Sequence, residues 1–235
     1  PSPSSASTWN AALSRAALAL ATLGALSACR RSEPVASAAP LPQAVYVWQR
    51  AWTEPVTEAT RSHGARFDRI VVLGAEIEWP RVARVSPDWA ALAATGRPID
   101  VALRVGPRTA SIADDDDAYG LILTTARAVV GEAKRAGSQL GMLQIDFDAA
   151  TRGLPDFTQW LTRLQKDLGR PVSFTALPAW LDAPGMKPLA EAAPEFVLQV
   201  HWLAPPQRAD QPMALCDPSA ARVAVKKAAR LGRPF

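Results

Sequence analysis

The sequence predicts an α/β fold in which helices cover a parallel sheet. Six short apolar runs alternate with helical patterns from residue 44 onward, which is typical of successive β–α units. The alternation fits both an open doubly wound sheet and a closed (β/α) barrel. No glycine-rich phosphate loop follows the first apolar run, so an open nucleotide-binding sheet lacks its usual support. We therefore expect a (β/α) barrel of the triosephosphate isomerase (TIM) type.

The start of the chain has the pattern of an export signal. Eleven uncharged residues, Ala16–Leu26, follow Arg15. This run is shorter than the ~20 residues that span a bilayer and has the length of a signal-peptide core. It leads into Leu26–Cys29, which resembles the lipobox of bacterial lipoproteins. The resemblance implies a lipoprotein signal peptide over residues 1–29 and a lipid on Cys29; the alternative is an ordinary signal peptide with a chance cysteine.

A tether and a location follow from this interpretation. Residues 30–43 are rich in Pro, Ala and Ser, the composition of a flexible linker. They would hold the domain, residues 44–235, away from a membrane to which the lipid attaches. Residue 30 is Arg, so no aspartate follows the cysteine, and we expect a periplasm-facing position at the outer rather than the inner membrane. With Cys29 lipidated, Cys216 has no disulfide partner.

The expected barrel domain contains six strands and three clear helices. The strands are Val45–Trp52, Arg69–Trp79, Asp100–Pro107, Leu140–Asp148, Val172–Leu181 and Phe196–Leu203. The helices are Asp117–Arg135, Asp156–Leu168 and Ser219–Leu231. A full barrel has eight strands and ~250 residues, so we expect an incomplete barrel whose C-terminal units are missing beyond Phe235.

The charge distribution argues against a nucleic-acid partner. The formal net charge is +4, but the last fourteen residues hold five basic residues and no acidic one. Basic and aromatic residues do not interleave there as they do in nucleic-acid-binding patches. We expect a solvated helix face, and no oligomeric state is predicted.

The predicted fourth strand carries the strongest functional signal. Side chains alternate along a strand, so Gln144, Asp146 and Asp148 share one face. Carboxylates two residues apart lie about 6.6 Å apart along the strand. When partly buried they raise each other's pKa, which is how an acid/base pair is made. Because the carboxyl ends of barrel strands form the active site, we expect Asp146 and Asp148 to be catalytic.

Polar residues occupy matching late positions on the other strands. Most are inward residues near the ends of their strands and should meet at one end of the barrel. Trp180, at the end of the fifth strand, adds an aromatic ring that suits stacking on a sugar, and we expect all of these residues to bind substrate. With Gln144, this set comprises Glu76, Glu78, Arg104, Trp180, Gln199 and His201. The sequence leaves open whether the two glutamates form ion pairs with Arg104, and which residues of the first strand face inward.

Four segments resemble a bacterial protein family called domain of unknown function 3142. They are Val47–Trp52, Leu143–Asp148, Thr175–Leu181 and Leu198–His201. The resemblance extends from Val45 to the end of the chain. It implies no established activity, and it implies that members continue past Phe235.

The segment Leu143–Asp148 is also similar to the fourth-strand motif of chitinase-like glycoside hydrolases, a run of alternating acids that ends in a catalytic glutamate. The resemblance implies that Asp148 stands in the place of the terminal acid. Asp146 matches the middle aspartate, which orients the substrate or shares a proton, and Gln144 replaces the preceding aspartate. The terminal position also differs, because aspartate is shorter than glutamate by ~1.5 Å, about one C–C bond.

These features favour an envelope-anchored carbohydrate-active enzyme, a hydrolase with Asp148 as general acid and Asp146 as its partner on a glycan. One alternative is a non-catalytic glycan-binding or scaffold lipoprotein on a degenerate barrel. Another is a metal-dependent hydrolase using Asp146, Asp148, Glu76 and His201. The sequence has no tight ligand motif, such as two histidines at helical spacing, so we expect no metal and no cofactor.

Overall fold

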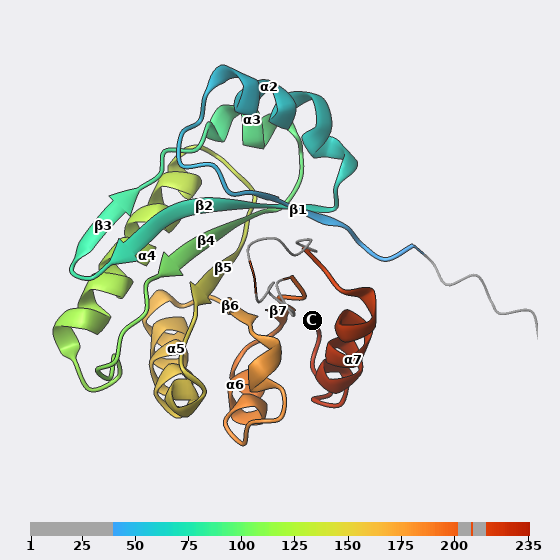
Figure 1. The fold of residues 1–235 in the computed structure, drawn as a ribbon. Coiled ribbons are helices and arrows are strands. Elements are labelled where there is room, and N and C mark those ends of the chain that lie inside the picture. Colours follow the sequence, from blue (N-terminus) through green and yellow to red (C-terminus); the bar gives the residue numbers. More distant parts are fainter. Residues whose placement is uncertain (1–39, 202–207, 209–214) are drawn as a thin grey trace, which may run out of the picture. The chain divides into compact units, whose positions relative to one another are not determined.

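In the computed structural model, which describes residues 40–201, 208 and 215–235, six parallel strands form one curled sheet (Figure 1). In the order in which they pair, the strands are β1 (Ala44–Val47), β2 (Arg69–Glu78), β4 (Ile99–Val105), β5 (Leu140–Phe147), β6 (Val172–Ala176) and β7 (Phe196–Leu198). A seventh strand, β3 (Arg81–Arg84), pairs antiparallel with β2 as a hairpin. The predicted signal segment, Cys29 and residues 30–39 of the predicted tether lie outside the described residues.

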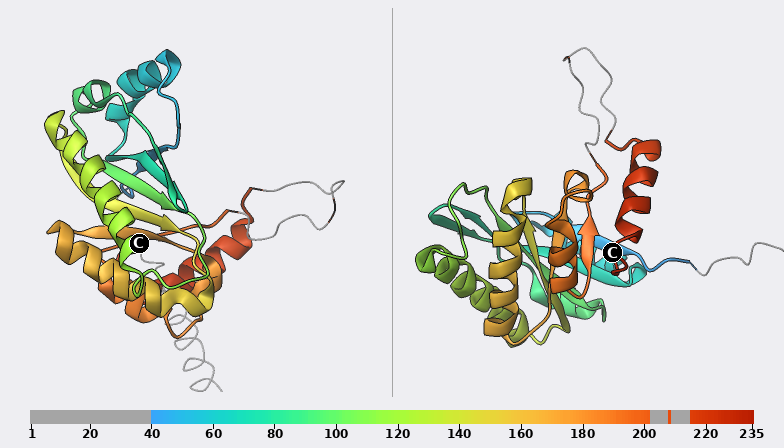
Figure 2. Two further views of the ribbon diagram at one scale, coloured as in Figure 1. Left: turned by 90° about the vertical axis from the view of Figure 1, so that its left-hand side faces the viewer. Right: turned by 90° about the horizontal axis from the view of Figure 1, so that it is seen from below.

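Helices connect the strands and cover the outer face of the sheet (Figures 1 and 2). They are α2 (Glu54–His63), α3 (Trp89–Ala94), α4 (Asp116–Arg135), α5 (Leu154–Leu168), α6 (Met186–Ala192) and α7 (Pro218–Ala229). The alternation of strands and helices and the curled parallel sheet confirm the predicted fold, with six strands of a barrel in the described part of the chain. None of the described helices is long and apolar enough to cross a membrane.

The core between the sheet and α5 is built from aromatic side chains. Phe157 and Trp160 of α5 stack on each other with ring centroids 4.8 Å apart. Phe157 also meets Phe147 of β5 and Phe174 of β6 edge-on, at 5.3 and 5.7 Å. Such pairs stabilise a fold by about 0.5–1.5 kcal/mol each beyond burial of their area. Gly169 ends α5 in the left-handed conformation, with φ of 61°. Because the aromatic residues of β5 and β6 face α5, the opposite, inner face of these strands is available to polar residues.

Two β-bulges break the regular ladder and bend the sheet. Gly74 is the extra residue of β2, since Leu73 pairs with Ala102 and Ala75 with Leu103. Before the bulge the odd-numbered residues of β2 face inward, whereas after it the even-numbered Glu76 does. Bulges kink a strand and increase its twist, so both features help to curl the sheet.

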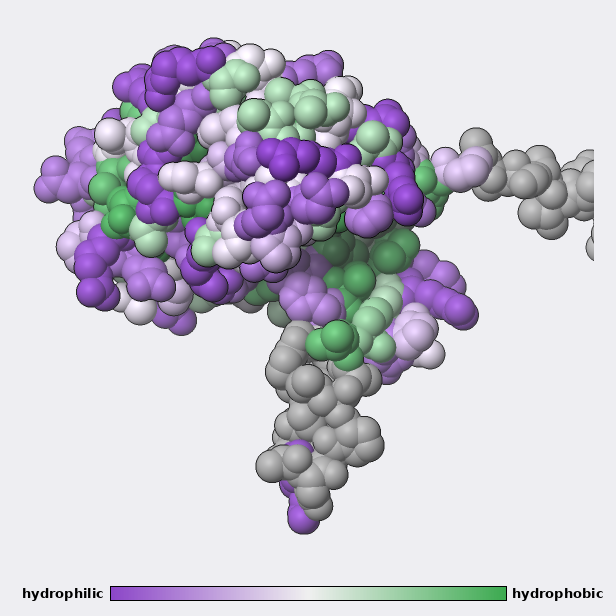
Figure 3. All heavy atoms as spheres, turned by 90° about the horizontal axis from the view of Figure 1, so that it is seen from above, coloured by the Kyte–Doolittle hydropathy of each residue, from purple (hydrophilic) through white to green (hydrophobic). Residues whose placement is uncertain are grey.

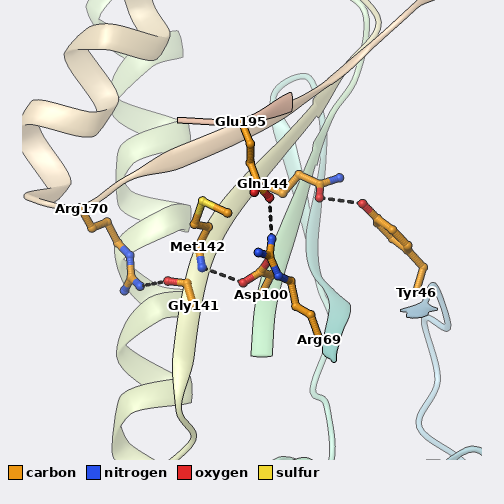
Figure 4. A network of polar contacts seen from close by, with 8 residues as sticks. All are labelled: Tyr46, Arg69, Asp100, Gly141, Met142, Gln144, Arg170 and Glu195. Carbon is orange, nitrogen blue, oxygen red and sulfur yellow. Dashed lines mark hydrogen bonds and ion pairs between the residues drawn. The ribbon is translucent and has the colours of Figure 1, made fainter. Parts of the chain in front are cut away.

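The second bulge lies in β5 at Gly141 and accommodates a buried carboxylate (Figure 4). Asp100 of β4 is 2% exposed, and its Oδ1 accepts the backbone N–H of Met142 at 2.7 Å. Arg69 forms ion pairs with both Asp100 and Glu195 and so joins the amino end of β2 to β4 and to the start of β7. Burial raises the pKa of Asp100, against the opposing effect of the Met142 N–H and Arg69. This network closes the end of the sheet opposite the predicted site.

Several predicted boundaries are wrong, and prolines explain the clearest case. The fifth predicted strand runs to Leu181, but β6 ends at Ala176 because Pro178 has no N–H for the ladder and begins a 3₁₀ turn, Pro178–Trp180. The first predicted strand stops at Val47, where its pairing with β2 ends. The last, β7, is three residues long, and positions 202 and 203 of that prediction lie outside the described residues.

Candidate functional site

The inner face of the curled sheet holds a cavity of about 510 Å³ near the carboxyl ends of the strands. We call it the inner cavity. Its polar and aromatic lining comes from β1, β4, β5 and β6 and from the segments that follow β1, β5 and β7. These residues are Tyr46, Trp48, Arg104, Gln144, Asp146, Asp148, Thr175, Gln199 and His201. Residues more than 150 positions apart in the chain therefore meet in one place.

Asp146 is held in a fixed orientation by its neighbours across the sheet. The Thr175 hydroxyl of β6 donates to Asp146 Oδ1 at 2.7 Å. The Gln199 side-chain amide, just after β7, donates to the same oxygen at 3.3 Å. Oδ2 accepts no hydrogen bond from another described residue, so this oxygen is available to a ligand in the cavity.

Asp148 follows directly after β5 and differs from Asp146 in its electrostatic setting. Partial burial raises the pKa of the Asp148 carboxyl, and the negative charge of Asp146 raises it further. The positive charges of Arg104 and His201 oppose this shift. Asp148 forms no hydrogen bond with another described residue, so no group in the described part of the chain engages its carboxyl oxygens.

Gln144 brings an unsatisfied donor to the same cavity (Figure 4). It is 2% exposed, and its Oε1 accepts the Tyr46 hydroxyl at 2.8 Å. Its Nε2 is buried and has no hydrogen-bond partner among the described residues. A buried amide N–H without a partner destabilises a protein by about 1–3 kcal/mol, so this group is ready to donate to a ligand oxygen or to water. Burial raises the pKa of Tyr46, which therefore keeps its proton at neutral pH.

A second cavity, of about 820 Å³, lies beside the first one. We call it the outer cavity. It is lined by Trp79 just after β2, by residues 107–111 after β4 and, around the start of α5, by residues 147–150, Arg152, Gly153 and Asp156. Asp148 lines both cavities. The carboxylate predicted to be a general acid therefore stands where the two spaces meet.

The structure brings five of the predicted polar residues into the inner cavity together with Gln144. They are Arg104, Asp146, Asp148, Gln199 and His201. Their convergence agrees with the prediction from strand alternation, although it does not test what each residue does.

Three other predicted residues lie elsewhere. Glu76 shares a row with Arg104 and Asp146 across the sheet, but it is 5% exposed and forms an ion pair with Arg50, not with Arg104. Glu78 is exposed, opposite Arg81 in the hairpin. Neither glutamate lines the inner or the outer cavity.

Trp180 belongs to the hydrophobic core. It is 1% exposed, its indole N–H donates to the Ala149 carbonyl at 3.1 Å, and its ring meets Phe157 edge-on. The prediction placed it at the end of a long fifth strand, near the polar cleft, where its ring would stack on a sugar. The turn that Pro178 begins directs it instead into the core.

Sequence reasoning missed Tyr46 and the whole outer cavity. Tyr46 of β1 lies two residues before Trp48, which follows the strand. Alternation along the chain, which places both residues on one face, was the available signal. The outer cavity is formed by loops, whose course no periodicity reveals. Among the described residues, no group of three or more His, Cys, Asp or Glu side chains is arranged to hold a metal ion.

Among the solved structures with a similar fold are a spore cortex-lytic enzyme and two chitinases. The spore cortex-lytic enzyme SleL of Bacillus cereus aligns with a TM-score of 0.62 and 13% identity, over 81% of this chain and 47% of that one. A chitinase from Bacteroides thetaiotaomicron gives 0.57 and 12%, over 80% and 62%. A GH18 chitinase mutant from Cycas revoluta, in complex with (GlcNAc)4, gives 0.55 and 15%, over 81% and 65%. The chain thus spans less than two thirds of each of these proteins.

At such low identity the likeness shows the fold, that of GH18 chitinase-like TIM barrels. None of the curated protein sequences matches the chain. The model of one protein family, described as a domain of unknown function (DUF3142), matches residues 95–235, starting later than the expected resemblance from Val45. This match covers more than half of the chain, which therefore belongs to the DUF3142 family.

Proposed function

We propose that the inner cavity binds a glycan and hydrolyses a glycosidic bond, with Asp148 as general acid. One observation carries the proposal: a carboxyl with a raised pKa stands at the carboxyl end of a barrel strand, two residues from a carboxylate held in place by two donors. Glycoside hydrolysis uses two carboxyl groups in different protonation states. The raised pKa of Asp148 suits the acid of such a pair, and Asp146, held by Thr175 and Gln199, suits its carboxylate partner.

In the proposed reaction, protonated Asp148 gives its proton to the glycosidic oxygen as the bond from that oxygen to the sugar carbon breaks. The leaving sugar departs as an alcohol, and positive charge develops on the remaining sugar ring. Asp146, oriented by Thr175 and Gln199, faces this charge with Oδ2. Water then adds to the sugar carbon and returns a proton to the site. Gln144 Nε2 supplies a donor that orients a sugar hydroxyl or amide carbonyl.

The comparisons support a glycan as the ligand. Two of the similar structures are chitinases, and one of them is in complex with (GlcNAc)4. The third is a cortex-lytic enzyme of spores. Trp48 and Tyr46, whose rings lie 6.1 Å apart, bring aromatic surface to the inner cavity. Aromatic faces pack well against sugar rings, so the lining suits a polymer of N-acetylated hexosamines.

A non-catalytic glycan-binding protein is the second candidate. The observation that favours it is the short Asp148 side chain in the position where chitinase-like enzymes have glutamate. Gln144, also in place of an acid, binds Tyr46 and leaves the site with one carboxylate fewer. Binding by such a site requires no proton transfer.

We also propose that the domain is a lipoprotein held in the bacterial envelope. The proposal rests on the uncharged run Ala16–Leu26, on the lipobox-like segment that ends in Cys29, and on the Pro/Ala/Ser-rich residues that follow. An anchored domain of this kind would act on glycans within reach of the membrane surface.

The experiment that tests catalysis compares the protein with its Asp148→Asn variant. Asparagine keeps the shape and cannot donate the acidic proton, so release of reducing ends from chitotetraose or from peptidoglycan strands should fall about 100-fold or more. Asp117→Asn, at an exposed position of α4, is the matched control and should keep full activity. Binding of the same glycans without turnover by the unaltered protein would favour the non-catalytic candidate.

A further inference from the structure

The outer cavity is a second ligand space that adjoins the proposed catalytic residue. Its volume of about 820 Å³ is within the range of 300–1,000 Å³ typical of ligand sites. Asp148 is part of its wall and of the wall of the inner cavity. A glycan whose scissile bond lies at Asp148 therefore extends into both cavities, one on each side of that bond.

A rigid platform forms one side of the outer cavity. The indole N–H of Trp79 donates to the Gly106 carbonyl at 2.8 Å, which fixes the ring. The Arg108 guanidinium lies 4.8 Å from the centre of that ring, a cation–π contact. Asp115, at the start of α4, forms an ion pair with Arg108 and holds it there. The platform is therefore in place before a ligand arrives.

Arg152 provides a positive charge that no acid in the described part of the chain neutralises. It lines the outer cavity, is exposed, and forms no ion pair or hydrogen bond with another described residue. Its backbone is nonetheless well placed, because it belongs to the 3₁₀ turn Thr151–Gly153 that leads into α5. Arg104, in the inner cavity, is exposed and equally without such a partner.

The acidic residues of the outer cavity do not counter Arg152. The Asp156 carboxylate accepts hydrogen bonds from the Ser111 hydroxyl and from the backbone N–H groups of Ile112 and Ala113, the latter two at 3.2 and 3.0 Å. Its negative charge is thus used to hold the loop before α4. Asp148 lies at the boundary with the inner cavity. Neither Asp148 nor Asp156 forms an ion pair with Arg152, so its guanidinium is available to a ligand.

We propose that the outer cavity binds a sugar unit that carries a carboxylate, with Arg152 pairing with that carboxylate and the Trp79–Arg108 platform packing against the sugar. Guanidinium groups bind carboxylates through two parallel N–H bonds, a geometry that neutral sugars do not offer. The substrate class is then an acidic glycan, in which carboxylated and N-acetylated units occur in one strand. The inference rests on the proposed function only in placing the glycan across Asp148.

The test measures binding by calorimetry, using the full-length protein with Asp148→Asn so that no probe is consumed. The probes are chitotetraose, a tetrasaccharide of alternating N-acetylglucosamine and N-acetylmuramic acid, and the methyl ester of that tetrasaccharide. The free acid should bind about tenfold more tightly than its ester, as expected for one charge-assisted contact. This preference should decrease as salt is added.

Matched variants locate the effect. Arg152→Gln, combined with Asp148→Asn, should abolish the preference for the free acid and leave binding of the ester unchanged. Arg152→Lys in the same background should retain part of the preference for the acid. Arg66→Gln removes an exposed arginine beside the amino end of β2 and should change nothing. Far-ultraviolet circular dichroism and melting curves show that each variant is folded.

The outcomes separate this inference from the proposed function. Equal affinity for acid and ester, or a preference that survives Arg152→Gln, overturns the acidic-glycan assignment even if the unaltered protein hydrolyses chitotetraose. An Arg152-dependent preference, together with no turnover of any probe by the unaltered protein, supports the assignment and contradicts catalysis. Failure of all three probes to bind at millimolar concentration counts against both.

Discussion

Asp148 stands where the two cavities meet, and its protonation links the site to the stability of the fold. Burial and the charge of Asp146 raise its pKa above the ordinary 3.8. Between pH 3.8 and the raised value, the folded protein binds more protons than the unfolded chain. The stability that the protonated Asp148 side chain contributes is therefore fully present below this pH window and is lost as the pH rises through it.

Asp148→Asn removes this pH dependence. At pH values below 3.8 the variant and the unaltered protein should melt at similar temperatures, because both side chains are neutral. As the pH rises toward 7, the melting temperature of the variant should exceed that of the unaltered protein by a growing margin. Melting curves at a series of pH values measure this. A margin that shrinks with rising pH contradicts the raised pKa.

Arg104 influences the same proton from the neighbouring strand. Because its charge lowers the pKa of Asp148, Arg104→Gln should raise that pKa. If Asp148 is the general acid, kcat/KM falls as the pH rises through its pKa, so this limb of the pH profile should move to higher pH in the variant. Arg66→Gln, far from the cavity wall, should leave the limb where it is. Movement toward lower pH argues against Asp148 as the acid.

The prediction of individual residues succeeded where strand alternation alone decides. Asp146 and Asp148 lie on the inner face because β5 is regular from Leu143 onward. Trp180 was misplaced because its position depends on a turn that leaves the strand. Arg152 was not recognised because loop geometry and an absent ion partner have no sequence signal.

At the scale of the elements, the β5 bulge requires a glycine at position 141. A Cβ atom at position 141 would lie 2.1 Å from Asp100 Oδ1. Gly141→Ala should therefore displace the carboxylate from the Met142 N–H and lower the free energy of unfolding by about 2–4 kcal/mol. Urea denaturation measures this loss.

Gly120→Ala is the matched control for that substitution. Position 120 lies inside α4, and no atom lies within 4 Å of a Cβ built there. Alanine should raise the free energy of unfolding by about 0.5–1 kcal/mol, because it favours helix and restricts the unfolded chain. If both substitutions change stability alike, the bulge does not impose the proposed restriction.

The helices and strands differ in how clearly their sequences predict them. α4 was predicted within one residue at its start, because acids at its beginning and basic residues at its end suit the helix dipole. α2, α3, α6 and β3 were not predicted individually. The last three are only four to seven residues long, and tertiary contacts rather than local pattern determine such short segments.

At the scale of the whole molecule, the curled sheet has two edges in the described part of the chain. β1 pairs with a strand on one side only. At the other edge, the Phe196 N–H of β7 donates to the Pro234 carbonyl, but no further described strand pairs with β7. On the face seen in Figure 3, hydrophobic residues gather in a recess of an otherwise mixed surface. Unpaired edges and apolar surface promote association between chains.

A protein limited to residues 44–235 should therefore self-associate. Size-exclusion chromatography with light scattering should detect dimers or larger species whose proportion rises with concentration. A Lys substitution at an exposed β1 position outside the cavity lining, such as Ala44→Lys, charges the edge strand and should reduce this association. A monomer that melts cooperatively at high concentration would contradict the prediction.

The proposed membrane anchor gives a prediction for the intact protein in a bacterial cell. Cys29→Ser removes the thiol that would receive lipid, so the protein should move from the membrane fraction to the soluble fraction after cell breakage. Cys216→Ser changes the other, exposed cysteine and should leave the distribution as it was. Retention of the Cys29→Ser variant in the membrane fraction would show that the lipobox interpretation is wrong.

The bulge in β2 should allow Gly74 to be deleted but not to be replaced by a residue with a larger side chain. Deleting Gly74 joins Leu73 to Ala75 and converts the bulge into an ordinary ladder, with Glu76 still facing inward. Replacing Gly74 with alanine brings a Cβ atom to 2.4 Å from Val129 Cγ1 and 2.6 Å from Val101 Cγ1. Homologous chains should therefore show a gap or glycine at this position, and a one-residue length difference there would leave the cavity lining unchanged.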